Sequence, residues 1–346
     1  MSSLGAQIHV GPLERARDRL ARLGGPPALR FAGRRLLTAI PVLWGVTLLT
    51  FIAMNSLPGD AAQELLGANA TPAEVHQLEL KLGLDKPFID RYWHWFTGIL
   101  HGSFGHSLAS GQSVIGILGA DLPITLELIA YSLVVSLVLA IPLALVCARW
   151  PNRVADKLSL GVSMVGLSIA NYVLALILVY LFAVKLNVLP AIGWTPPGQS
   201  VGGNLKSLTL PALSIGLPLF CFYTRLLRAD LLEHMQSEEY VVTARAKGAG
   251  PWRVLIRHAL RNSVFGLITI VALNLGALLG ATVIIEDIFG LPGMGHELLS
   301  AINTRDVPVV EGAVLIFAVM VVAANFLADL LYSLLDPRIR YGGSAG

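Results

Sequence analysis

The sequence has few charged residues and almost no cysteine. Only 14% of its 346 residues are charged, 55% are hydrophobic, and the mean hydropathy is +0.68. Too few charged side chains remain to cover a soluble protein of this length, so the composition favours a membrane protein with several spans. Cys147 and Cys221 lie in or at the ends of apolar runs, which predicts small membrane residues and excludes a disulfide frame.

Sequence motifs for nucleotide, redox and metal chemistry are also missing. No G-x-x-x-x-G-K-[ST] phosphate loop occurs, and Gly290, Gly293 and Gly295 lack the spacing of a dinucleotide fingerprint. None of the eight histidines falls in a predicted span, which argues against an intramembrane hydrolase or proton relay, and their spacing fits no standard metal site. We therefore expect this chain to bind no metal, nucleotide, other cofactor or nucleic acid.

Six apolar segments are long enough to cross the membrane as helices, which takes about 20 residues each. None alternates as a barrel strand does, so we predict an all-α polytopic protein with six transmembrane helices. The fourth is the weakest, because Pro211 and Pro218 interrupt it. The predicted spans are 36–57, 122–148, 158–186, 208–227, 264–285 and 312–335.

The distribution of Lys and Arg predicts the orientation. With a cytoplasmic N-terminus, the inner stretches 1–35, 149–157, 225–262 and 336–346 hold 19 of the 25 Lys and Arg residues, so both termini are expected inside. About 35 polar and basic residues precede the first span, which does not predict a cleavable signal peptide. The inner segments are a basic arm at 1–35, the turn 149–157, the loop 228–263 and the tail 336–346; the outer ones are an insert at 58–121, the segment 187–207 and the loop 286–311.

The outer insert has its own helix signals. The tetrapeptide Thr-Pro-Ala-Glu at 71–74 predicts a capping box with proline at the first helical position. A second helix is expected to start near Pro87 and to carry aromatic residues suited to a membrane interface. These are Tyr92, Trp93, Trp95 and Phe96. Two interpretations stay open: a lid packed on its own helices, and a surface for a delivery protein.

A polar segment, EEYVVTARAKGAGPWRVLIRHALRN at 238–262, separates the fourth and fifth predicted spans. Its composition predicts a short helix over 240–247, ended by Gly248 and Gly250, with a second helix starting at Pro251. Small Ala244 and Ala246 would let a partner approach closely, with charge from Arg245 and Lys247 at the rim. A plain solvated loop is the alternative.

Five polar residues fall inside predicted spans, where they are costly. They predict either interhelical hydrogen bonds, each worth well under about 2 kcal/mol, or part of a polar substrate path. The spacing Gly276-x-x-x-Gly280 would let another helix approach closely and predicts a subunit interface. The five residues are Glu127, Asn171, Asn274, Asn325 and Asp329.

Five stretches, in order, resemble one family of membrane proteins. They are RRLLTAIPVLWGVTLLTFIAMNSLPGD, LGLDKPFIDRYWHWFTGILHGSFGHS, DLPITLELIAYS, EDIFGLPGMGHELLSAINTRDVPVVEG and LLDPRIRYG. From about Arg34 to Arg340 the chain resembles the inner-membrane permeases of ATP-binding-cassette (ABC) importers for dipeptides, oligopeptides and nickel. The similarity is to the first of the two permeases in such systems, the dipeptide permease B type.

The resemblance extends to the polar segment. TARAKG at 243–248 and RHALRN at 257–262 are similar to the peptide branch of the family. At the positions of the general Glu-Ala-Ala motif stand Val242, Thr243 and Ala244, so the acid is absent and Glu238 or Glu239 would have to replace it. The resemblance implies that an ATPase-coupling helix uses Glu239, Tyr240, Thr243, Ala244, Arg245, Lys247 and Gly248.

The resemblance also implies a fold and partners. It implies the six-span fold of type I ABC importer permeases in the plasma (inner) membrane, with the lipid bilayer around it. The implied partners are a homologous second permease, two ATP-binding subunits (or one fused) that carry ATP and Mg, and an extracytoplasmic substrate-binding protein. The implied cargo is short peptides, with nickel chelates, glutathione or haem as alternatives.

Two other classes of function remain as rivals. An ion-gradient-driven secondary transporter would work without ATPases, and Glu127 or Asp329 alone could serve it, although no inverted repeat of broken helices is visible in the sequence. A membrane enzyme would need a catalytic constellation inside the spans, and the sequence shows none.

Overall fold

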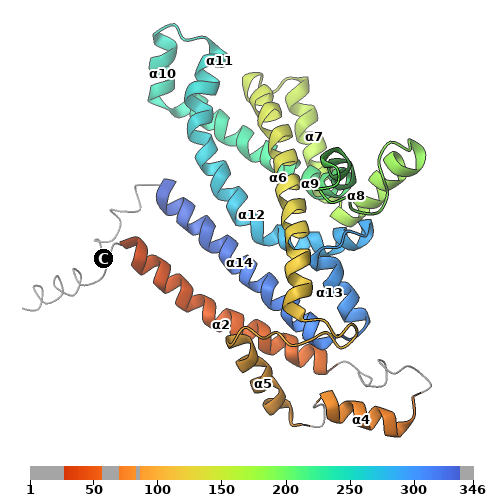
Figure 1. The fold of residues 1–346 in the computed structure, drawn as a ribbon. Coiled ribbons are helices and arrows are strands. Elements are labelled where there is room, and N and C mark those ends of the chain that lie inside the picture. Colours follow the sequence, from red (N-terminus) through yellow and green to blue (C-terminus); the bar gives the residue numbers. More distant parts are fainter. Residues whose placement is uncertain (1–26, 57–69, 83–85, 336–346) are drawn as a thin grey trace, which may run out of the picture.

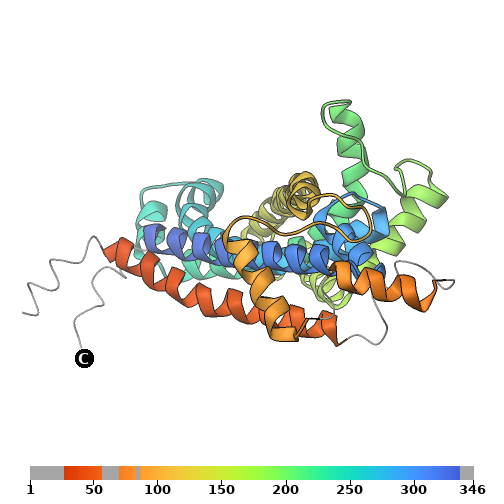
Figure 2. The same ribbon diagram turned by 60° about the horizontal axis from the view of Figure 1, so that its bottom comes forward.

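The computed structural model describes residues 27–56, 70–82 and 86–335, and the regular structure in these ranges is helical (Figures 1 and 2). The predicted all-α class is confirmed. Five helices are long and apolar enough to cross a membrane, or six crossings result if one bent pair counts as a span. The five are α2 (Pro27–Asn55), α6 (Val114–Arg149), α9 (Val201–Ser237), α12 (Leu260–Phe289) and α14 (Val307–Leu335).

Several helices extend beyond the predicted spans. Helix α9 runs to Ser237 and not to 227, and α14 begins at Val307 and not at 312. The charged residues that end the apolar run of α9 are set among Leu, Ala and Met, which are good helix formers, so the helix continues although the hydropathy falls. Helix α2 begins at Pro27, while the rest of the predicted arm and the tail 336–346 lie outside the described residues.

The third predicted span, 158–186, is not one straight helix. Helix α7 (Val154–Ser168) and the pair α8 (Asn171–Leu178) and η1 (Val179–Lys185, a π-helix) meet at an angle of 105°. Ile169 and Ala170 adopt extended backbone angles and interrupt the helical hydrogen bonds. The break contains no glycine or proline, so the sequence carried no signal for it.

Helix α9 lies at the centre of the helix bundle. Its residues Leu210, Ala212 and Ile215 are buried in one apolar cluster with α6, α8 and α12. A second cluster joins Tyr223 and Leu227 of α9 to α6 and to the start of α12. Helix α2, in contrast, lies along α14 at the edge of the bundle and is mostly exposed (Figure 1). The elements around α9 therefore form the core of the molecule.

Both helices predicted in the insert are confirmed as α4 (Pro72–Leu82) and α5 (Phe88–Leu100). The backbone N–H of Thr71 donates to Glu74 at 2.9 Å, its hydroxyl donates to the same carboxylate, and these bonds lower the pKa of Glu74. Tyr92 of α5 lies edge-on to Phe51 of α2, with ring centroids 5.4 Å apart, and its hydroxyl lies 3.1 Å from that of Thr47. The aromatic residues of the insert thus pack against the end of α2.

Candidate coupling surface and translocation path

The polar segment folds as a helix, a tight turn and a second helix, as predicted. Helix α10 (Glu239–Ala246) ends in a turn in which Gly248 has φ +80°, and Pro251 opens α11 (Pro251–Val254) at its first position. The N–H of Gly248 donates to the carbonyl of Arg245 at 2.9 Å, and that of Ala249 to Ala244 at 3.1 Å. Positive φ is the reason the turn requires glycine, because L side chains rarely adopt it.

Side-chain hydrogen bonds fasten α10 to two long helices. Asn262 of α12 donates to the hydroxyl of Tyr240 at 2.9 Å, and the same hydroxyl lies 3.3 Å from Nδ1 of His234 on α9. Arg245 donates to the carbonyl of Met235 at 3.2 Å. The hydroxyl of Tyr240 therefore connects α9, α10 and α12, and we call this arrangement the Tyr240 joint. A displacement of α10 would change the hydrogen bonds of this joint to both long helices.

The two faces of α10 differ in exposure. Val241 and Ala244 are buried against Val254, while Thr243, Ala246 and Lys247 are exposed. Of the two small residues expected to admit a partner, only Ala246 therefore offers an open surface. The Glu239 side chain lies outside the described residues. A groove of about 510 Å³ separates α10 from the following helices and is lined by Tyr240, Thr243, Ala244, Lys247, Gly248, Ala249, Arg253 and His258.

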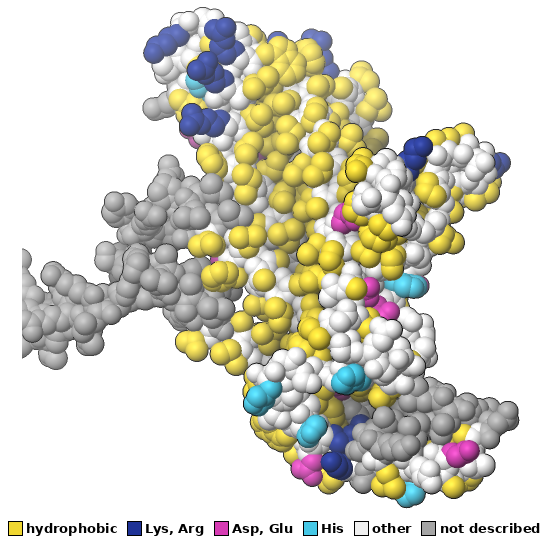
Figure 3. Space-filling view, in the orientation of Figure 1, with side chains coloured by type: hydrophobic (Ala, Val, Ile, Leu, Met, Phe, Trp, Pro, Cys, Tyr) yellow, Lys and Arg dark blue, Asp and Glu magenta, His cyan; other side chains and the backbone are white. Residues whose placement is uncertain are grey.

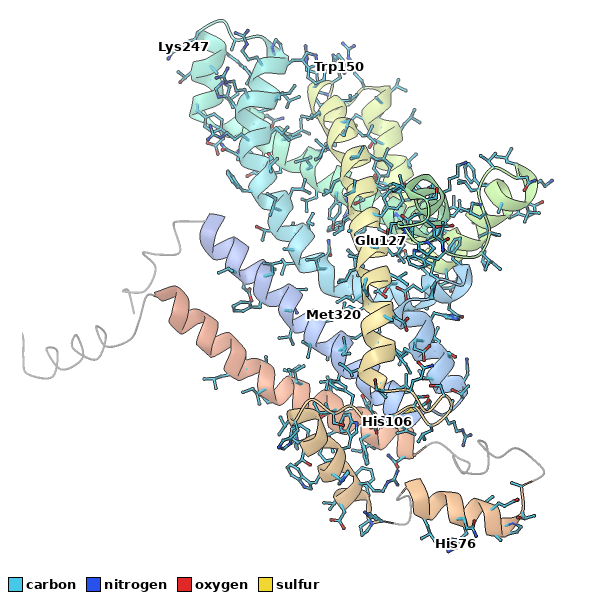
Figure 4. All side chains as sticks on the ribbon, in the orientation of Figure 1. His76, His106, Glu127, Trp150, Lys247 and Met320 are labelled. Carbon is cyan, nitrogen blue, oxygen red and sulfur yellow. The ribbon has the colours of Figure 1, made fainter. Side chains whose placement is uncertain are left out.

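This end of the molecule is basic. Figure 3 shows Lys and Arg gathered over α10 and α11, whereas most of the visible His side chains lie towards the opposite end. Figure 4 places Lys247 and Trp150 at one end and His76 and His106 at the other. A broad apolar surface separates the two ends in Figure 3, as expected for a molecule that crosses a membrane.

The turn between α6 and α7, predicted as one of the inner segments, lies at this end, but the sequence did not reveal its side-chain contacts. The ring of Trp150 meets that of Trp252 edge-on, with centroids 5.7 Å apart. Asp156, which is 1% exposed, accepts two hydrogen bonds from Arg228 of α9 and one from the backbone N–H of Asn152 at 2.8 Å. The partners come from segments far apart in the chain, so no local pattern predicted the pairing.

Two of the five polar span residues come together. Asn171, at the start of α8, and Asn274 of α12 line one cavity of about 220 Å³ beside α9. The amide of Asn274 also donates to the hydroxyl of Tyr223 at 3.4 Å. Asn274 therefore makes an interhelical hydrogen bond, which was one of the two alternatives, and it also faces a cavity.

A second cavity, of about 360 Å³, continues along the same helix. It is lined by Phe222, Arg225, Leu226, Ala229, Asp230 and Glu233 of α9. Phe222 lines both cavities. The sequence reasoning missed this second cavity, because the predicted span ended at 227 and the charged residues beyond it were assigned to a loop.

Comparisons with known proteins agree with this architecture. Residues 140–341 match the family described as binding-protein-dependent transport system inner membrane component, and residues 28–129 match the model of the N-terminal part of such membrane components. The chain belongs to this family. It is therefore an inner-membrane permease with several spans, and its system also includes ATPase and binding-protein subunits.

Several relatives match over nearly their whole length. A protein of Brucella abortus (strain 2308), named as a peptide transport system permease, is 36% identical over 308 residues, which cover 89% of this chain and 98% of the relative. The dipeptide transport system permease protein DppB of Alkalihalophilus pseudofirmus is 34% identical over 333 residues, or 90% and 100%. The glutathione transport system permease protein GsiC of Escherichia coli (strain K12) is 32% identical over 313 residues, or 90% and 99%. The predicted family and the prediction of a transport subunit without ATPase activity are confirmed.

The other residues predicted for a path lie elsewhere in the permease. Asn325 and Asp329 of α14 line a cavity of about 300 Å³ against α2. Glu127 lies midway along α6 and lines none of these three cavities (Figure 4). The predicted path residues therefore divide into separate groups: Asn171 and Asn274 line one cavity, Asn325 and Asp329 line another, and Glu127 lines neither.

The two glycines of the predicted interface motif have different surroundings. A Cβ on Gly276 would lie 3.4 Å from Val321, so this glycine faces α14 of the same chain. A Cβ on Gly280 would meet no atom within 4 Å. The close approach expected at Gly276 is thus made within the permease, and Gly280 leaves an open surface.

Buried acids hold the end of the permease opposite to α10. Glu286 of α12 is fully buried and accepts the backbone N–H of Gly295 at 2.7 Å, at the start of α13 (Met294–Asn303). Asp306 accepts hydrogen bonds from Ser107 and from the N–H of Leu108 at 3.1 Å. These bonds fix the segment before α6 and the segment around α13 against each other.

Proposed function

We propose that this permease imports short peptides, driven by ATP-binding subunits that push on α10. The observation that carries the proposal is the joint at Tyr240, which links an exposed, basic helix–turn–helix to both α9 and α12. The relatives named for peptide, dipeptide and glutathione transport support the cargo class, because all three match about nine-tenths of this chain. Closure of the ATPases would bias the permease between inward-open and outward-open states.

The basic end carrying α10 is proposed to face the cytoplasm, with both termini on that side. The support is the excess of Lys and Arg at that end, since the positive-inside rule relates such an excess to orientation. Thr243, Arg245, Lys247 and Gly248 would then contact the ATPase, with Glu239 beside them and Tyr240 and Ala244 transmitting the movement inward.

Three kinds of partner complete the proposed transporter. A homologous second permease would contact the face that includes Gly280, where a side chain would meet no atom of this chain within 4 Å. Two ATP-binding subunits, separate or fused, would bind ATP and Mg. An extracytoplasmic binding protein would deliver cargo to the end formed by α13 and the insert.

Reconstitution tests this function. The permease is co-purified with the products of candidate partner genes and placed in proteoliposomes with the binding protein. We expect ATP hydrolysis to rise with loaded binding protein and labelled dialanine to accumulate inside. Accumulation of glutathione, nickel chelate or haem without dialanine would show that the cargo is not a short peptide of this kind. Uptake by the permease alone, driven by an ion gradient, would refute the ATP-driven mechanism.

A further inference from the structure

One face of α9 carries both cavities next to that helix. Ile215, Pro218 and Phe222 line the first, and the second continues from Phe222 to Glu233. These positions recur every three or four residues, so they share one side of the helix. At about 1.5 Å per residue the face from Ile215 to Glu233 extends about 27 Å along the helix.

The two halves of this face differ in chemistry. Neutral amides, Asn171 and Asn274, line the first cavity, while the second has charges of both signs at Arg225, Asp230 and Glu233 above an apolar floor. Charged residues within transmembrane helices are costly and face a water-filled cavity or a partner group. The cavity volume of about 360 Å³ lies in the range of small-molecule sites, roughly 300–1,000 Å³.

We propose that the second cavity is a bipolar site for a zwitterionic peptide, which holds the terminal carboxylate at Arg225 and the terminal ammonium at Asp230 and Glu233. This inference rests on the proposed function, because it needs short peptides as cargo. The site adds to that function a binding place within the permease, next to the coupling helix, where cargo is held before release.

The spacing of these residues along the helix axis fits short peptides. Arg225 and Asp230 are separated by about 7.5 Å along the helix axis, and Arg225 and Glu233 by about 12 Å. An extended chain spans about 3.3–3.6 Å per residue, so two residues span about 7 Å and three about 11 Å. Oδ2 of Asp230 also lies 3.8 Å from Nε2 of His234, so this histidine lies beside the proposed position of the peptide's ammonium group.

Phe222 separates this site from the amide-lined cavity. Its side chain lines both cavities, so a peptide moving along this face of α9 would contact it. The bipolar site lies on the α10 side of Phe222, so cargo bound there has already passed this residue on its way inward.

Transport by charge variants tests the site in the complete transporter. Arg225→Gln and Glu233→Gln should each lower dialanine import roughly tenfold, the loss expected when a hydrogen bond to a charged group is removed. The double exchange R225E/E233R should restore import in part, since a zwitterion can bind in reverse. The two side chains start about 12 Å apart along the axis, so a direct ion pair would not explain that rescue. Lys206→Gln, at the exposed opposite end of α9, is the matched control and should import at the wild-type rate.

A second measurement keeps the inference testable if charge variants assemble poorly. Ala229→Cys places an exposed thiol in the site, whereas the native Cys147 and Cys221 are buried. In the assembled transporter, a membrane-impermeant maleimide should label this thiol, and dialanine should slow the labelling.

Distinct outcomes separate the inference from the proposed function. Unchanged import in both charge variants, or labelling that dialanine does not slow, overturns the bipolar site. An Ala229→Cys thiol that reacts in the isolated permease but not in the complex, together with loss of the second permease from the charge variants, would show that this face is a subunit contact. If the wild-type complex imports no peptide, the proposed cargo fails, whatever the variants do.

Discussion

Replacing Gly248 by valine should uncouple ATP hydrolysis from transport. Gly248 has φ +80°, a conformation that costs a β-branched residue roughly 1–3 kcal/mol. A Cβ at this position would meet no atom within 4 Å, so the strain arises from the backbone and not from a clash. The turn is closed by two backbone hydrogen bonds, from Gly248 to Arg245 and from Ala249 to Ala244, worth about 1 kcal/mol each.

The backbone strain that valine would introduce and the free energy of the two hydrogen bonds that close the turn are therefore similar in size. A cost of about 2 kcal/mol changes the ratio of intact to opened turn about 30-fold. Opening of the turn should not unfold the long helices, because their buried side chains belong to separate clusters around α9. The turn should open while the helix bundle stays folded, and α10 should lose its fixed position.

The assay compares three forms in proteoliposomes. Gly248→Val should retain assembly and basal ATP hydrolysis but lose most uptake per ATP, whereas Gly248→Asn should keep near-wild-type uptake because asparagine tolerates positive φ. Size-exclusion chromatography checks that the complex is intact. Uptake by Gly248→Val at the wild-type rate would refute the argument that the turn must be rigid.

Three further predictions follow from single contacts. Tyr240→Phe removes the hydroxyl joint and should lower uptake several-fold with assembly unchanged; equal uptake per ATP would contradict its role. Asp156→Asn removes the negative charge that accepts two hydrogen bonds from the part-buried Arg228, a loss of about 2 kcal/mol, so the thermal midpoint of the purified complex should fall, and an unchanged midpoint would count against it. Gly295→Ala places a Cβ 2.5 Å from the Cα of Val283, so the end around α13 should destabilise and capture of the binding protein should weaken in a pull-down; full capture would show that this end adapts.

Local signals predicted the coupling surface well. Gly248, Gly250 and Pro251 act on the backbone of their own turn, so the helix–turn–helix could be read from the sequence, as could the capping box at Thr71 and Glu74. The apolar runs likewise predicted that long helices exist, because hydrocarbon requires internal backbone hydrogen bonds.

Features that depend on distant contacts could not be predicted. The break at Ile169 and Ala170 carries no breaker residue. The cavity at Asn171 and Asn274 exists because α8 and α12 meet beside α9. The charged face of α9 around Arg225 could not be predicted, because the fall in hydropathy marks the end of the apolar run and not the end of the helix.

The position of α2 has a consequence for measuring motion in this permease. The helix is held near one end by the ring of Phe51 and the hydroxyl of Thr47 against α5, and along its length it rests on α14. Helix α2 therefore connects α14 to the insert, so a movement of one relative to the other must change the contacts of α2. Pairs of spectroscopic labels on α2 and α14, one pair near Phe51 and one near Thr38, would measure that change during the transport cycle.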